Sequence, residues 1–95
     1  MRREIYEVNA KVVDATGAYN NLTGYPASFD SRHYDNDLEK TRRRAYGSYS
    51  DACKAGYNAD GRPLTIITLL RISDGFQLAS TQIGDMPELP DGGEE

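Results

Sequence analysis

The sequence predicts an α+β domain in which one helix packs on one face of a small antiparallel or mixed sheet. Three observations predict it. Apolar residues alternate with polar ones near the start of the chain, small residues recur at helical spacing in the middle, and a long apolar segment runs into a turn near the end. The expected order is strand, short strand, helix, strand, strand. Residues 1–84 are expected to form a single domain, since a chain of 95 residues fits one core.

The first strand is predicted over residues 3–14. A two-residue period is typical of a strand with one buried and one solvated face. The apolar positions of this period are Tyr6, Val8, Ala10 and Val12. Residues 15–28 are rich in turn formers and predict a loop. A short second strand over residues 27–31, centred on Phe29, is expected to pair with the first.

The helix is predicted to begin near Asn36 and to stop near Gly56, with Asn58 and Gly61 as further stop signals. Asn36 followed by Glu39 resembles a capping box. One stripe at 100° per residue collects the small and apolar side chains. Its members are Leu38, Thr41, Ala45, Tyr49, Ala52, Cys53 and Gly56. Such a stripe favours a helix that lies close to the sheet.

Residues 63–72 form the most apolar segment of the chain and predict a central strand. Because the single helix covers one face of the sheet, the other face is expected to stay open. Four side chains of this strand are expected to point to the open face: Thr65, Ile67, Leu69 and Arg71.

A hairpin is predicted to join this strand to a final strand over residues 76–83. Residues 73–75 form its expected three-residue loop, with Gly75 at the position that needs a positive φ. In that register two cross-strand pairs share a face: Ile72 with Phe76, and Leu70 with Leu78.

The charge of the chain is unevenly distributed. It has 11 basic and 15 acidic residues, and five of the acidic residues lie after Gly84, where there is no Lys or Arg. Residues 85–95 also contain two prolines and two glycines, which predict a flexible acidic tail. Residues 1–84 then carry a net charge of +1, which argues neither for nor against a nucleic-acid partner.

The sequence indicates a soluble protein of the cytoplasm. No apolar stretch approaches the ~20 residues that span a bilayer, and the start of the chain lacks the apolar region of a signal peptide. The single cysteine fits a reducing compartment. No membrane partner is expected.

No set of residues predicts catalysis, a metal site or a bound cofactor. His33 is the only histidine and is expected at the surface just before the helix, and Cys53 lies on the buried stripe. A metal site needs more ligands than these two supply, and a nucleophilic thiol needs exposure and a cationic neighbour. An enzyme that uses His33 or Cys53 is therefore the third hypothesis.

A basic cluster on the helix is the most prominent candidate for partner binding. We define the basic cluster by Lys40, Arg42, Arg43, Arg44, the adjacent Tyr46, and Arg32 before the helix. Arginine beside tyrosine suits phosphate and base contacts, and it equally suits a carboxylate-rich protein surface. The same pattern also describes a solvated helix face with internal ion pairs, such as Glu39 with Arg43.

Seven tyrosines and no tryptophan form a second distinctive feature. Tyr19 and Tyr25 fall in the long loop, where they could serve an interface. The alternative is that several of the tyrosines simply cap the edges of a small core. The first hypothesis is a non-catalytic protein-interaction module that uses the open sheet face and the sheet edges, with a protein partner or a homo-oligomer. The size and layout of the predicted domain are typical of small accessory proteins of phages and mobile elements. The alternative is a nucleic-acid-associated accessory protein that uses the basic cluster.

Overall fold

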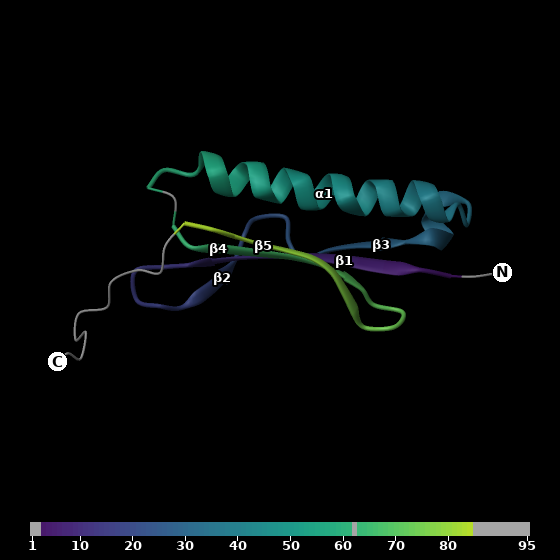
Figure 1. The fold of residues 1–95 in the computed structure, drawn as a ribbon, viewed down its shortest axis with the longest axis horizontal. Helices are drawn as coiled ribbons and strands as arrows, with labels where there is room; N and C mark the ends of the chain where they lie inside the picture. Colours follow the sequence, from purple (N-terminus) through teal and green to yellow (C-terminus); the bar gives the residue numbers. More distant parts are fainter. Residues whose placement is uncertain (1–2, 62, 85–95) are drawn as a thin grey trace.

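The computed structural model describes residues 3–61 and 63–84. One helix lies along one face of a five-stranded antiparallel sheet, in two layers (Figure 1), so the predicted α+β fold and its helix on one face are confirmed. The predicted acidic tail over residues 85–95 lies outside the described residues.

The elements follow the predicted order, with two additions, one short strand and one 3₁₀ turn. They are β1 (Ile5–Val13), β2 (Tyr19–Asn21), β3 (Ala27–Asp30), the 3₁₀ turn η1 (Ser31–Tyr34), α1 (Leu38–Asn58), β4 (Thr65–Arg71) and β5 (Phe76–Ile83). The sheet order is β2–β1–β4–β5, and β3 also pairs with β1. β2 lies in the segment that was predicted as loop from its turn-forming residues. Only three residues pair there and all three are exposed, so they form no buried alternation.

The pairing of β1 with β4 decides which residues form the core. Val8 pairs with Leu69 and Ala10 pairs with Ile67. Paired residues of antiparallel strands point to the same face, and all four are at most 1% exposed beneath the helix. The expectation that Thr65, Ile67, Leu69 and Arg71 face the open side is therefore wrong. The open side of β4 carries Ile66, Thr68 and Leu70.

The N-cap of the helix lies one residue later than predicted, and the helix ends two residues later. Asp37 is the N-cap, and its side chain accepts a hydrogen bond from the backbone N–H of Lys40. Asn36 instead adopts a left-handed backbone with φ 59°. Gly56 is not the stop signal. It is buried inside α1, where a Cβ would lie 2.9 Å from Ile83 Cδ1, so glycine lets the helix approach the sheet.

The hairpin register is correct along most of β5 and wrong at the loop. From Thr65–Ile83 to Leu69–Ala79 the pairs follow the predicted register. A bulge beside Leu69 and Leu70 then shifts the pairing by one residue, so that Leu70 pairs with Gln77 and Arg71 pairs with Phe76. The loop is four residues long, and Gly75 has the predicted positive φ of 72°.

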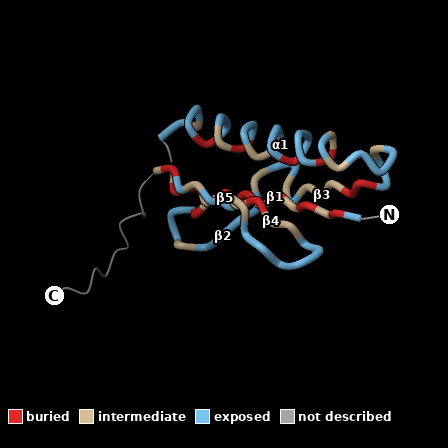
Figure 2. Tube along the Cα trace, turned by 45° about the vertical axis from the view of Figure 1, so that its right-hand side comes forward, coloured by how far each residue is buried: buried red, intermediate tan, exposed pale blue. Residues whose placement is uncertain are grey.

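The core is a single layer between α1 and the sheet. Buried residues recur along both α1 and the strands (Figure 2). The buried members of the core are Tyr6, Val8, Ala10, Ala45, Ala52, Ile67, Leu69 and Ile83. The predicted stripe on the helix is confirmed: Thr41, Ala45, Ala52 and Gly56 are buried, and Cys53 packs against the core. The layer is thin because the helix contributes small side chains.

Candidate interaction surfaces

Arg42 of the basic cluster is held by the sheet. Its Nε donates hydrogen bonds to Glu4 Oε1 (3.0 Å) and Tyr6 Oη (2.8 Å), and its Nη2 lies 2.9 Å from Glu4 Oε2. The Glu4 side chain is only 2% exposed, whereas that of Arg42 is 46% exposed. The Tyr6 hydroxyl also donates to Glu4. Arg42 therefore neutralises a buried carboxylate as well as presenting a charge at the surface.

The pKa directions within this group agree with the contacts. Hydrogen bonds to Glu4 and then Tyr6 raise the pKa of Arg42, so the guanidinium stays charged. Burial, followed by the hydrogen bond to Glu4, raises the pKa of the Tyr6 phenol. A phenol held in this way stays protonated at neutral pH.

Two other arginines of the basic cluster also have partners. Arg32 Nη2 lies 3.3 Å from Asp30 Oδ2, and Arg3 Nη2 lies 2.7 Å from the same oxygen. Hydrogen bonds from Arg3 and then from the Arg32 backbone hold the pKa of Asp30 well below its usual range. Arg44 lies over the ring of Tyr34, with its Cζ 5.9 Å from the centroid.

The remaining members of the basic cluster lie on the outer surface of α1. Arg43 is exposed, Lys40 is half-buried and Tyr46 is 46% exposed. At 100° per residue, Lys40 and Arg43 share this face with Asp51, so it carries both signs of charge. The structure thus divides the basic cluster between internal ion pairs and a mixed outer face. A role in partner binding stays a prediction.

His33 and Cys53, the two residues considered for catalysis or metal binding, lie in different elements. His33 is exposed in η1, and Cys53 is half-buried on α1 against the core. Within residues 3–61 and 63–84, no three His, Cys, Asp or Glu side chains gather into a group that could hold a metal ion. Nor does the described chain contain a helix with the length and apolar character needed to cross a membrane.

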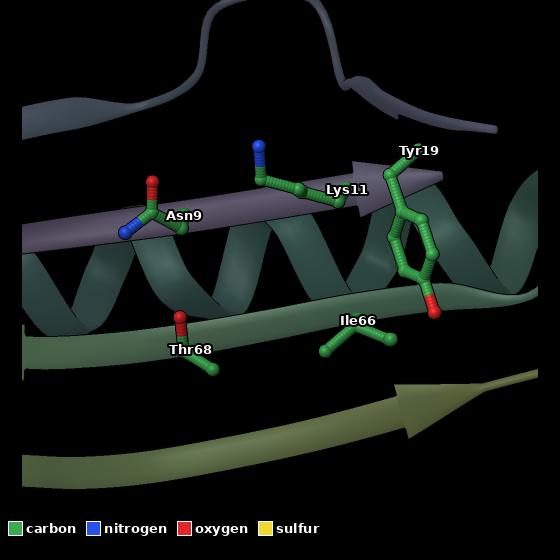
Figure 3. Close-up of a pocket in the computed structure, with 5 residues that line it drawn as sticks. All are labelled: Asn9, Lys11, Tyr19, Ile66 and Thr68. Carbon is green, nitrogen blue, oxygen red and sulfur yellow. The ribbon is translucent and has the colours of Figure 1, made fainter. Parts of the chain in front are cut away.

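A groove lies on the open face of the sheet. Its lining comes from two neighbouring cross-strand pairs of β1 and β4, with one side chain from β2, and it encloses about 330 Å³. The lining residues are Asn9, Lys11, Tyr19, Ile66 and Thr68. The Tyr19 ring reaches across β1 toward Ile66 (Figure 3), so an aromatic and an aliphatic surface meet at one end of the groove. Asn9 and Thr68 form its polar end.

The sequence pointed only partly to this groove. Tyr19 was considered for an interface in the predicted loop, but Asn9 and Lys11 were assigned no role. Both lie at the polar positions of the β1 alternation. Such positions indicate a face that the core does not cover, but they do not indicate what binds there. Ile66 was assigned to the wrong side of β4. The groove depends on the register of three strands, and no single segment encodes that register.

A second hollow lies between α1 and the end of the hairpin. It encloses about 200 Å³ and is lined by Tyr6, Arg42, Tyr46, Arg71 and Leu78. Arg71 pairs with Asp74 (Nη2 to Oδ2, 2.8 Å) and lies over Phe76, which is 57% exposed. Each arginine in this hollow already contacts a carboxylate, so the hollow has little net charge to attract an anion.

Comparisons with known proteins identify no relative. No protein family model matches the chain, and no curated protein or solved structure shows significant similarity. Inference about function therefore depends on the surfaces of this structure.

Proposed function

We propose that this domain is a non-catalytic protein-interaction module that binds a protein partner through the open face of its sheet. The observation that carries the proposal is the one-sided covering of the sheet by α1 (Figure 1). On the open face, Ile5, Ile66 and Leu70 are half-buried among polar neighbours. Apolar side chains framed by polar ones are typical of protein-binding surfaces.

The groove suggests what such a partner presents. Ile66 and Tyr19 offer an apolar surface, and Lys11, which also lines the groove, adds an exposed cation. The chemistry that fits is an apolar side chain flanked by a carboxylate, with an amide or hydroxyl for Asn9 and Thr68. A segment of a partner protein supplies these groups together.

The charges of the helix support a protein partner over nucleic acid. Binding to nucleic acid needs several cations that are available to contact the phosphates of its backbone. Arg42 and Arg32 already contact carboxylates, and Asp51 adds negative charge to the outer face. Nucleic-acid binding through Arg43 and Arg44 is the alternative, and the experiment must distinguish it from protein binding. A role as an accessory protein of a phage or mobile element stays a prediction from layout.

The test is a pull-down of the tagged protein from its native host, with and without nuclease. Three forms are compared: wild type, Ile66→Glu, and Arg43→Ala/Arg44→Ala. Ile66→Glu places a charge in the groove, and the double variant removes two exposed helix cations. Circular dichroism and thermal melting establish that each variant is folded.

We expect a protein that survives nuclease, is lost with Ile66→Glu and is retained by the double variant. The captured protein is then titrated in purified form against both variants to measure its affinity. Nucleic acid that disappears with the double variant would establish the alternative instead. Equal capture by all three forms would remove the groove from consideration.

A further inference from the structure

β5 forms an edge of the sheet, and no strand within residues 3–61 and 63–84 pairs with its outer side. The opposite edge is divided between β2 and β3, which are three and four residues long. β5 is eight residues long and contains no Lys, Arg, Asp, Glu or Pro. Edge strands of monomeric proteins are commonly guarded by charges or proline, because their unpaired backbone groups can bind another strand. The sequence of β5 provides neither.

The hydrogen bonds between β1 and the flanks of β4 show which backbone groups of β5 point outward. Two bonds connect the flanks of β4 to β1: Val13 N–H to the Leu64 carbonyl (2.9 Å) and Ile72 N–H to the Ile5 carbonyl (2.7 Å). Alternate residues of a strand bond to opposite neighbours, and the β1–β4 register is unbroken between these bonds. Even-numbered residues of β4 therefore bond to β1, and odd-numbered ones bond to β5.

The same alternation continues into β5. The odd residues of β4 pair with Ala79, Thr81 and Ile83. These three residues use their backbone groups within the sheet, so those of Ser80 and Gln82 face away from it. Both side chains are exposed on the open face. The edge thus presents two consecutive sets of outward N–H and C=O groups.

We propose that β5 pairs in an antiparallel manner with β5 of a second copy of this chain, across a two-fold axis perpendicular to the sheet. A two-fold rotation places each outward N–H opposite an outward C=O, so an antiparallel edge is complementary to itself. The absence of charge in β5 removes like-charge repulsion between the copies. The result is one continuous sheet with both helices on the same face.

The bulge beside Leu69 and Leu70 sets the strength of this contact. It leaves a regular edge over residues 79–83, which is too short to bury the ~1,200 Å² of a standard interface by itself. We therefore expect a reversible dimer whose population changes with micromolar to millimolar concentration. This pairing uses the strand edge, whereas the proposed partner site uses the face of the sheet.

The test measures mass by sedimentation velocity over that concentration range. Ser80→Lys brings two like charges, one from each copy, close to the axis, and Ser80→Pro removes an outward N–H that the β4 ladder does not use. Thr68→Lys is the matched control, since Thr68 pairs directly with Ser80 on the same face but lies in the central strand. Amide exchange at Ser80 and Gln82 reports on the edge itself.

We expect wild type and Thr68→Lys to move from 10.6 kDa toward twice that mass, with Ser80 and Gln82 amides becoming protected as the dimer forms. Ser80→Lys and Ser80→Pro should weaken the dimer by about tenfold or more. Three results would overturn the proposal: a wild type that stays monomeric, a dimer that Thr68→Lys abolishes, or edge amides protected at all concentrations. None of them bears on capture through Ile66.

Discussion

The Arg42 guanidinium lies on the Glu4 carboxylate with two contacts of 3.0 and 2.9 Å, and it joins the first half of α1 to the start of β1. These residues are 38 positions apart in the chain. The contact closes the end of the core at which Tyr6 is buried. It also removes one arginine from the charge available to a partner.

Replacing Arg42 should destabilise the fold through the carboxylate that it leaves behind. Arg42→Ala is expected to lower the free energy of unfolding by about 2–3 kcal/mol, toward the low end for a broken buried pair because the guanidinium is half-exposed. Arg43→Ala is the control, with an expected change within about 0.5 kcal/mol. Urea denaturation measures both. Equal effects would mean that Glu4 does not depend on Arg42.

Two neighbouring isoleucines test which face of β4 is the core. Ile67 is fully buried beneath the helix and Ile66 is half-buried on the open face. Ile67→Ala should cost about 3–4 kcal/mol, and Ile66→Ala should cost about 1 kcal/mol or less. Denaturant titration of the two variants gives the difference. A reversed order would invert the assigned faces.

The two glycines inside α1 should respond oppositely to alanine. No atom lies within 4 Å of a Cβ built at Gly47, so Gly47→Ala should stabilise the protein by about 1 kcal/mol through helix propensity. At Gly56 the new methyl group meets Ile83 Cδ1, and we expect a net loss of about 1–2 kcal/mol. Thermal unfolding measures both changes.

A second substitution shows whether the Gly56 contact is the cause. Ile83→Val removes the Cδ1 atom, so combining it with Gly56→Ala should cost less than the two separate changes together. Additive costs would exclude this contact as the source of the loss.

Asp14 should make stability dependent on acid. Hydrogen bonds from the side chains of Thr16 and then Asn20, with backbone N–H groups, lower the pKa of Asp14 from 3.8 to about 2. Because the folded pKa is depressed, the stabilisation is fully present above about pH 4 and is lost as the pH falls through about 2. The stability difference between wild type and Asp14→Ala should therefore shrink between about pH 4 and pH 2. A constant difference would contradict this.

Elements with a clear period were predictable from the sequence, whereas contacts between elements were not. The alternation around Val8 identified β1 and its buried face, and the small-residue stripe identified the packed side of α1. β4 is apolar on both faces, so its own pattern could not distinguish Ile66 from Ile67. Only pairing with β1 does so, and pairing depends on residues some 60 positions away.

At the candidate surfaces too, the residue types were visible in the sequence, but their contacts with other elements were not. Arg42 and Arg43 look alike in the sequence, and only the fold places the buried Glu4 beneath one of them. Gly56 carried the pattern of a helix stop, but its function depends on Ile83 across the layer. The bulge at the hairpin arises where β4 and β5 approach their loop, and its position is not marked by glycine or proline in either strand.

The pairing of β1 with β4 has a consequence for how the chain acquires this structure. Tyr6 is paired with Arg71, so β1 cannot pair with β4 until nearly the whole domain has been synthesised. Proteins dominated by such distant pairs fold in about milliseconds to seconds, well behind helical bundles. During translation the β1–β2–β3 segment and α1 emerge before the strand that completes their core. Closure of the sheet then depends on the final hairpin.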